Sequence, residues 1–328
     1  MTDDLTTESS SRLRSASLGT TGVGRAKWRD AIGRHDLVIF FLLAFLLSWY
    51  PWVLAIARDR TSGPNPLGPF VAALIVTGVV EGWSGIRALL GRIVRVRIGL
   101  RWYAVIFGLP VLLCATAVAI MAALGQVTAS PTVAAWRELP DRFLFIFLFI
   151  GLGEEPGWRG FALPRLQKNN SPLTASLILA PLWALWHLPL MGNEFPPAVI
   201  PAFLISLLGG TLIQTWLFNR TRGSVFAQML FHATVNTVGA GLIFPLFKAT
   251  SFPLFWSIYA VLWLAVAIVI SASRKGGFEP PASKVGDLEI APPFELGISA
   301  VLSGGAEADS ASQQNAGRRA PHPRPDRI

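Results

Sequence analysis

Long apolar stretches follow one another from Leu37 to Ser273 and constrain the fold more than any other feature of the sequence. A helix needs about 20 consecutive apolar residues, within a range of roughly 17–25, to cross the hydrocarbon core of a bilayer. Charged residues make up only 14% of the chain, against about 25% in a soluble globular protein. We therefore predict an all-α integral membrane protein, a bundle of about eight transmembrane helices. The predicted spans are Leu37–Ala57, Phe70–Ile86, Trp102–Leu124, Phe143–Leu163, Leu173–Met191, Val199–Phe218, Val225–Phe247 and Pro253–Ala272.

Basic residues alternate between the two sides of this bundle. Residues 87–101 hold five arginines, and the loops 164–172 and 219–224 add more, whereas the loops on the other side hold fewer. Because cytoplasmic loops are enriched in Lys and Arg, both termini are predicted to be cytoplasmic. The same bias explains the net charge of +9, so no nucleic-acid partner is expected. The segment Arg87–Trp102 is predicted to lie along the inner headgroup surface, in contact with membrane lipids.

The two ends of the chain differ in composition from the apolar region between them. Residues 1–36 and 274–328 are polar and poor in aromatic residues, so a disordered tail is predicted on each side of a transmembrane domain over residues 37–273. The first apolar stretch is too long for the core of a cleaved signal peptide and indicates a retained anchor. We expect a multi-pass protein of a bacterial cell membrane. The single cysteine, Cys114, excludes an intramolecular disulfide.

Two adjacent acids, Glu154 and Glu155, follow the apolar stretch 143–150, where a charge at bilayer depth costs about 2.5–3.5 kcal/mol. Glu155 and Arg159 are four residues apart, so they share a helix face and can pair. Glu154 then points about 100° away and is free for another role. Pro156 lacks a backbone N–H and is predicted to bend the helix. Four glycines should let other helices or a substrate approach closely: Gly151, Gly153, Gly157 and Gly160.

Two of the four histidines lie inside predicted spans. His187 is in the fifth span, and His232 is in the seventh, four residues before Asn236 on the same helix face. Intramembrane ionisable groups usually mark a pathway or an active site. Counted from the inner ends of their spans, Glu154 and His232 lie about 12–18 Å deep and His187 about 21 Å deep. The groups therefore converge only if Pro181 bends the fifth span or if that span begins later.

These residue types suit hydrolysis. A buried carboxylate such as Glu154 can act as a general base toward water, and His187 can share the proton or orient the water. His232 and Asn236 carry donors of the kind that stabilise a developing oxyanion. Glutamate and histidine are also zinc ligands, while the sequence contains no H-E-x-x-H and no G-x-S-x-G motif. Water activation with a metal and without one therefore both remain open.

Three short motifs follow one another on separate predicted spans: Glu154-Glu155-x-x-x-Arg159, Trp183-x-x-x-His187 and His232-x-x-x-Asn236. Over about residues 140–240 they resemble the motifs of the CPBP family, which contains the CaaX proteases and the bacteriocin-processing enzymes also called Abi proteins. The family usually has phenylalanine at the position of Trp183. Because tryptophan keeps an aromatic ring on the same face, we expect little consequence from this departure.

The resemblance implies an intramembrane endopeptidase of eight helices whose site opens toward the cytoplasm. By analogy, the catalytic residues are Glu154, His187, His232 and Asn236, and the supporting residues are Glu155 and Arg159. Glu154 and His187 would activate water, and the other two catalytic residues would form the oxyanion hole. A glutamic mechanism without a cofactor is favoured. The alternative is a metalloprotease in which Glu154, His187 and His232 bind a divalent metal such as zinc. The expected substrate is a peptide or a membrane protein.

Two other functions compete with the protease. One is a non-enzymatic immunity or scaffold protein of the membrane, built on the same fold. The other is a transporter or proton relay, which would also use glutamate and histidine. Secondary transporters often consist of two related halves, and the absence of such halves from this sequence counts against the last alternative.

Overall fold

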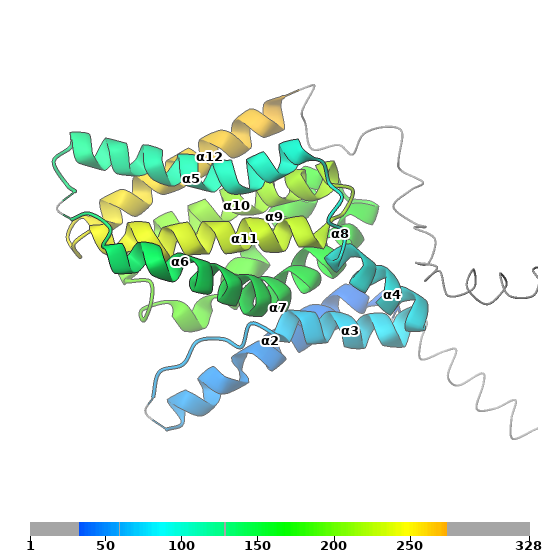
Figure 1. The fold of residues 1–328 in the computed structure, drawn as a ribbon. Coiled ribbons are helices and arrows are strands. Elements are labelled where there is room, and N and C mark those ends of the chain that lie inside the picture. The colour runs from blue at the N-terminus through cyan, green and yellow to red at the C-terminus, as the bar shows by residue number, and fades with distance from the viewer. Residues whose placement is uncertain (1–32, 59, 128, 274–328) are drawn as a thin grey trace, which may run out of the picture. The chain divides into compact units, whose positions relative to one another are not determined.

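The computed structural model describes residues 33–58, 60–127 and 129–273, and the regular elements within them are helices (Figure 1). The predicted fold class, an all-α membrane protein, is confirmed. The predicted tails, 1–36 and 274–328, lie outside the described residues except for 33–36. The elements are α2 (Asp36–Ile56), α3 (Gly68–Val80), α4 (Gly82–Ile93), α5 (Leu100–Ala123), α6 (Val133–Phe145), η1 (Ile146–Gly151), α7 (Leu152–Glu155), η2 (Pro156–Ala162), α8 (Leu163–Asn169), α9 (Pro172–Trp186), η3 (Leu188–Leu190), η4 (Pro197–Val199), α10 (Ile200–Arg220), α11 (Val225–Val238), η5 (Gly239–Ile243), η6 (Phe244–Leu246) and α12 (Phe252–Ala272).

Within the described residues, five helical segments are long and apolar enough to cross a membrane. They are Asp36–Ile56, Leu100–Ala123, Pro197–Arg220, Val225–Leu246 and Phe252–Ala272. Two further apolar helices, α3 and α9, have only 13 and 15 residues. The chain is therefore a multi-pass membrane protein, while the number of eight spans and the cytoplasmic position of both termini stay predictions.

The second predicted span, Phe70–Ile86, is wrong as a single helix. α3 ends at Val80, and α4 begins at Gly82, at an angle to α3 (Figure 1). Gly82 has a φ of 68°, a conformation that glycine adopts more readily than other residues. The Glu81 side chain accepts a hydrogen bond from Arg165 of α8. An acid and a left-handed glycine in succession thus end the apolar helix early.

The fourth predicted span, Phe143–Leu163, is a helical run with two wider turns. α6 passes into η1, which is a π-helix, and a second π-helix, η2, begins at Pro156 after the short α7. Because Pro156 has no N–H to donate to the residue four positions earlier, it favours a departure from α-helical geometry at this point. The disturbance predicted at Pro156 therefore takes the form of a change from α- to π-helix directly after the two acids.

The fifth predicted span, Leu173–Met191, is shorter than expected. α9 starts with a cap in which Ser171 Oγ accepts from the N–H of Thr174 at 3.1 Å, and it ends at Trp186. His187 is the C-cap residue, and the 3-10 turn η3 follows directly. His187 therefore lies at the end of a 15-residue helix rather than inside a longer one.

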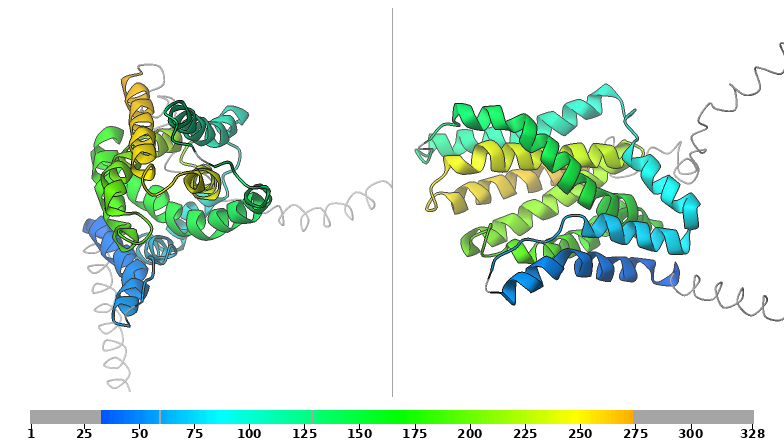
Figure 2. Two further views of the ribbon diagram at one scale, coloured as in Figure 1. Left: turned by 90° about the vertical axis from the view of Figure 1, so that its left-hand side faces the viewer. Right: turned by 60° about the horizontal axis from the view of Figure 1, so that its bottom comes forward.

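Glycines bring the acid-bearing segment close to its neighbours. A Cβ added to Gly153 would lie 2.5 Å from the carbonyl oxygen of Pro66, and one added to Gly157 would lie 2.6 Å from Pro69. A Cβ on Gly151 would lie 3.2 Å from a backbone oxygen of α11. The close approach predicted from these glycines is confirmed. As a result, α7 packs against both α3 and α11. α3 in turn lies beside α2 in both views of Figure 2.

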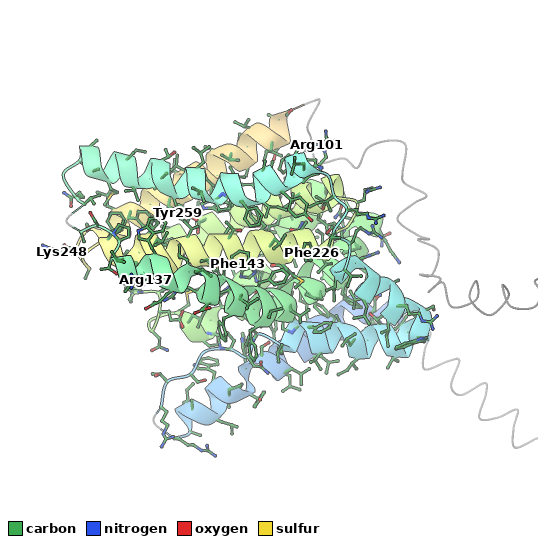
Figure 3. The ribbon with its side chains drawn as sticks, viewed as in Figure 1. Arg101, Arg137, Phe143, Phe226, Lys248 and Tyr259 are labelled. Carbon is green, nitrogen blue, oxygen red and sulfur yellow. The ribbon has the colours of Figure 1, made fainter. Side chains whose placement is uncertain are left out.

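Charged side chains lie at the two ends of the helices. Figure 3 shows Arg101 at one end and both Arg137 and Lys248 at the other, with Phe143 and Phe226 between them. Along their length the helices expose large apolar side chains, as a lipid-facing surface requires. On α2 and α12 they include Val38, Leu42, Leu46, Val261, Ile268 and Val269.

The arginine-rich segment Arg87–Trp102 is packed against the rest of the protein, in addition to any contact with lipid. α4 contacts η2, where Arg92 donates from Nη1 to the carbonyl oxygen of Gly160 at 2.9 Å. Burial, together with the neighbouring Arg95 and Arg165, lowers the pKa of Arg92 to about 10. The position of the segment along the headgroup surface stays a prediction. The segment also packs against the helical run that carries the acids.

Candidate active site

The second of the two adjacent acids is held by two donors. Arg159 donates from Nη1 to Glu155 Oε1 at 3.1 Å, as the spacing of four residues predicted. The Nδ1 of His232 donates to the same oxygen at 2.7 Å. The Glu155 and Arg159 side chains are 0% and 1% exposed, so this is a buried ion pair. Besides the pairing with Arg159 expected from the sequence, Glu155 connects α7 to α11 through His232.

The first acid has a different environment. Glu154 is 3% exposed, and its Oε2 accepts a hydrogen bond from the indole Nε1 of Trp183 at 3.0 Å. Its Oε1 has no hydrogen-bond partner among the described residues. Phenylalanine, usual at this position in the family, has no N–H with which to hold this carboxylate, so the contact goes beyond the aromatic ring expected from the sequence.

His187 completes the side of the site that lies on α9. Its Nδ1 contacts the carbonyl oxygen of Trp183 at 2.8 Å. Because a carbonyl oxygen only accepts, this Nδ1 must carry a proton. In the neutral ring, Nε2 is then left as an acceptor. The ring packs on Trp183 and Phe203, each with a centroid separation of 5.4 Å.

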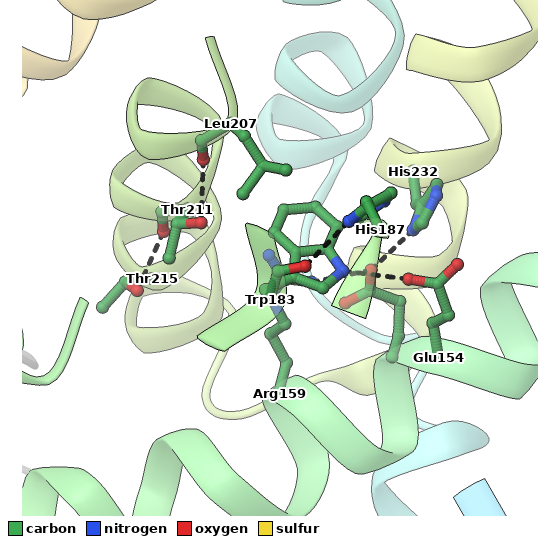
Figure 4. Close-up of polar contacts among 9 residues, drawn as sticks. Glu154, Arg159, Trp183, His187, Leu207, Thr211, Thr215 and His232 are labelled. Atoms are coloured by element: carbon green, nitrogen blue, oxygen red, sulfur yellow. Dashed lines mark hydrogen bonds and ion pairs between the residues drawn. The ribbon is translucent and has the colours of Figure 1, made fainter. Parts of the chain in front are cut away.

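The three separate helices meet at one place, as the sequence required for a functional site. Trp183 is the link, because its ring lies 6.1 Å from that of His232, measured between centroids, while its N–H reaches Glu154. Figure 4 shows the side chains of Glu154, Trp183, His187 and His232 close together. α9 begins at Pro172, so the span does not start later than expected, and Figure 4 nevertheless shows His187 close to Glu154.

Asn236 lies one turn beyond His232 on α11 and is partly exposed. Its side-chain amide makes no hydrogen bond with any other described residue. The same holds for the Nε2 of His232, since only the Nδ1 of that ring is bonded. Both groups are therefore available to a ligand from the same helix.

The metal alternative concerns the donors of Glu154, His187 and His232. Among the described residues, no group of three or more His, Cys, Asp or Glu side chains is placed to hold a metal ion. Each of the three side chains makes a protein hydrogen bond from one atom, which leaves a second nitrogen or oxygen on each. The mechanism without a cofactor and the metal alternative both stay predictions.

The sequence analysis named Trp183 as a departure from the family motif but did not predict its contact with Glu154. It also did not predict the contact between Glu155 and His232, which are 77 residues apart in the chain. Neither of these two contacts follows from spacing along one helix, so only the fold reveals them.

The fold and the buried cluster together define a helical membrane protein with ionisable groups gathered inside it. Residues 136–238 match the family of type II CAAX prenyl endopeptidase Rce1-like proteins. The chain is also 32% identical, over 102 residues, to a protein of Methanococcus maripaludis named CAAX prenyl protease 2, in an alignment that covers 28% of this chain and 38% of that protein. The chain thus aligns with well under half the length of this curated relative. These matches bear out the predicted resemblance to the CPBP family. The segment that matches the family, residues 136–238, contains every predicted site residue.

Proposed function

We propose that this protein is an intramembrane endopeptidase that hydrolyses peptide bonds with a water molecule activated by Glu154. The observation that carries the proposal is the environment of this acid. It is buried in α7, one oxygen is held by Trp183, and the other has no partner among the described residues and lies beside two histidines. A buried, oriented carboxylate with a free oxygen is what a general base requires.

The residues divide the reaction between them. Glu154 Oε1 accepts a proton from water while the neutral His187 orients the same water through Nε2. The water oxygen bonds to the scissile carbonyl carbon, and the carbonyl oxygen becomes an oxyanion. The amide of Asn236 donates to this oxyanion, as does Nε2 of His232 when that ring carries both protons. Glu154 then returns its proton to the leaving amine as the C–N bond breaks.

Glu155 and Arg159 act behind these groups. The carboxylate of Glu155 fixes the ring of His232 through Nδ1, so that Nε2 faces away from the ion pair. Arg159 keeps Glu155 in place from one turn further along the same segment. Such outer contacts position reacting groups without touching the substrate.

The name of the relative from M. maripaludis suggests a first substrate to test, a peptide with a prenylated cysteine in a C-terminal C-a-a-X motif. Purified protein in lipid nanodiscs is incubated with a fluorogenic farnesylated peptide and with the same peptide lacking the farnesyl group. We expect cleavage by the wild type and at least about 100-fold slower turnover by Glu154→Ala and His187→Ala. Cleavage of neither peptide by the wild type, or equal cleavage by Glu154→Ala, would refute the proposal.

A further inference from the structure

Trp183 contacts several members of the site. Its indole Nε1 donates to Glu154 at 3.0 Å, and its backbone carbonyl oxygen accepts from His187 at 2.8 Å. The face of the indole ring lies 4.0 Å from the guanidinium carbon of Arg159. The side chain is 7% exposed, so these contacts are made inside the protein.

The two neighbouring acids have different partners around this ring: Glu155 pairs with Arg159, and Glu154 accepts from Trp183. Arg159 donates to Glu155 and packs its guanidinium against the Trp183 ring, which is a cation–π arrangement. No hydrogen bond joins Arg159 to Glu154 among the described residues. Glu154 is instead held by a neutral donor. A neutral indole N–H restrains a carboxylate without forming an ion pair with it, so the acid keeps its ability to take a proton.

Phenylalanine at this position would keep the ring over Arg159 and lose the donor. Glu154 Oε2 would then be a buried oxygen without its partner, and the carboxylate would be free to rotate. A general base must be held within hydrogen-bond reach of the water that it deprotonates. The orientation of the base therefore depends on an atom that phenylalanine does not have.

We infer that Trp183 is a positioning residue, whose indole N–H fixes Oε2 of Glu154 so that Oε1 faces the attacking water. This inference rests on the proposed function and adds to it a residue that does not touch the substrate. It predicts that the departure from phenylalanine matters for turnover, and that its effect passes through Glu154 and not through the packing of the helices.

The test compares two Trp→Phe exchanges in the full-length protein. Trp183→Phe removes the bonded N–H. Trp158→Phe is the matched control, because Trp158 is fully buried and its Nε1 has no hydrogen-bond partner among the described residues. Since a hydrogen bond to a charged group is at stake, we expect kcat of Trp183→Phe to fall about 10- to 100-fold with KM changed less than about twofold. The control should keep kcat within about threefold.

Both exchanges shrink a buried ring, and Trp183→Phe also leaves Glu154 Oε2 without its donor, so this variant should unfold in detergent more readily than the control. A further variant removes the effect of size: benzothienylalanine at position 183, in which sulfur replaces the indole N–H, should lose kcat as Trp183→Phe does. Wild-type kcat in this variant would overturn the inference even if Trp183→Phe fails to fold. If wild type cleaves, Glu154→Ala does not, and Trp183→Phe matches Trp158→Phe, the inference fails while the proposed function stands. If Glu154→Ala still cleaves, the proposed function itself has failed.

Discussion

Exchanging each acid for its amide should separate stability from catalysis, because Glu154→Gln and Glu155→Gln change the shape equally little but meet different partners. Glu155 Oε1 accepts from Arg159 and from His232. Glutamine at this position removes the negative charge and leaves a guanidinium that is 1% exposed without its ion-pair partner. Removing one member of a buried pair costs about 3–5 kcal/mol. Because the amide oxygen of glutamine still accepts one of the two donors, we expect the lower end, about 3 kcal/mol, or a roughly 100-fold loss in the folding equilibrium.

Glu154→Gln should behave in the opposite way. The oxygen of its amide can still accept from the neutral indole of Trp183, so the free energy of unfolding should change by less than about 1 kcal/mol. The amide is not a base, and turnover should fall by about 100-fold or more.

Two assays on the same preparations decide between these expectations. Reversible unfolding in mixed micelles, followed by circular dichroism, gives the free energy of unfolding, and cleavage of the peptide that the wild type accepts gives kcat. Equal free energies of unfolding for the two variants would refute the division of roles between the acids. So would a Glu154→Gln protein with wild-type turnover.

Three further outcomes follow from the site and its packing. Gly157→Ala should destabilise the protein by about 1–3 kcal/mol, because the new Cβ would lie 2.6 Å from Pro69. Gly91→Ala is the control and should not destabilise the protein, because a Cβ at Gly91 meets nothing within 4 Å. A Gly157→Ala protein with wild-type stability in the micelle assay would contradict the close packing. Arg159→Lys should lower the free energy of unfolding although it keeps the charge, because the planar guanidinium is lost from a buried ion pair; the same assay measures it, and wild-type stability would argue against that geometry. Asn236→Leu should reduce kcat about 100-fold with little change in unfolding, because this amide makes no hydrogen bond with other described residues; full kcat would exclude it from the oxyanion hole.

The fold class was predictable because a bilayer leaves a chain few choices. Every backbone group in the hydrocarbon core needs an internal partner, so long apolar stretches must be helices or closed barrels. The ends of the helices were less predictable. Glu81 and Gly82 stop α3 within a stretch that is otherwise apolar, and α9 stops at Trp186 although apolar residues continue to Met191. Average hydropathy does not register such local stops.

The site was predictable where its contacts run along one helix. The spacing of Glu155 and Arg159 was sufficient to pair them. The contacts between helices were not predictable in this way, because they join residues far apart in the chain. Glu154 meets Trp183 across 29 residues, and Glu155 meets His232 across 77. No rule of periodicity pairs such residues, so the sequence identified the ionisable members of the cluster but not the contacts between helices.

The close approach of Pro66 and Pro69 to Gly153 and Gly157 limits how the protein can move. Since there is no room for even one added carbon at these two contacts, sliding or tilting of α3 against the acid-bearing segment is opposed by steric contact. We expect the two to move together. On the proposed function, access of a peptide to the carboxylates would then depend on other helices, and cross-linking those helices should slow turnover without disturbing the acids.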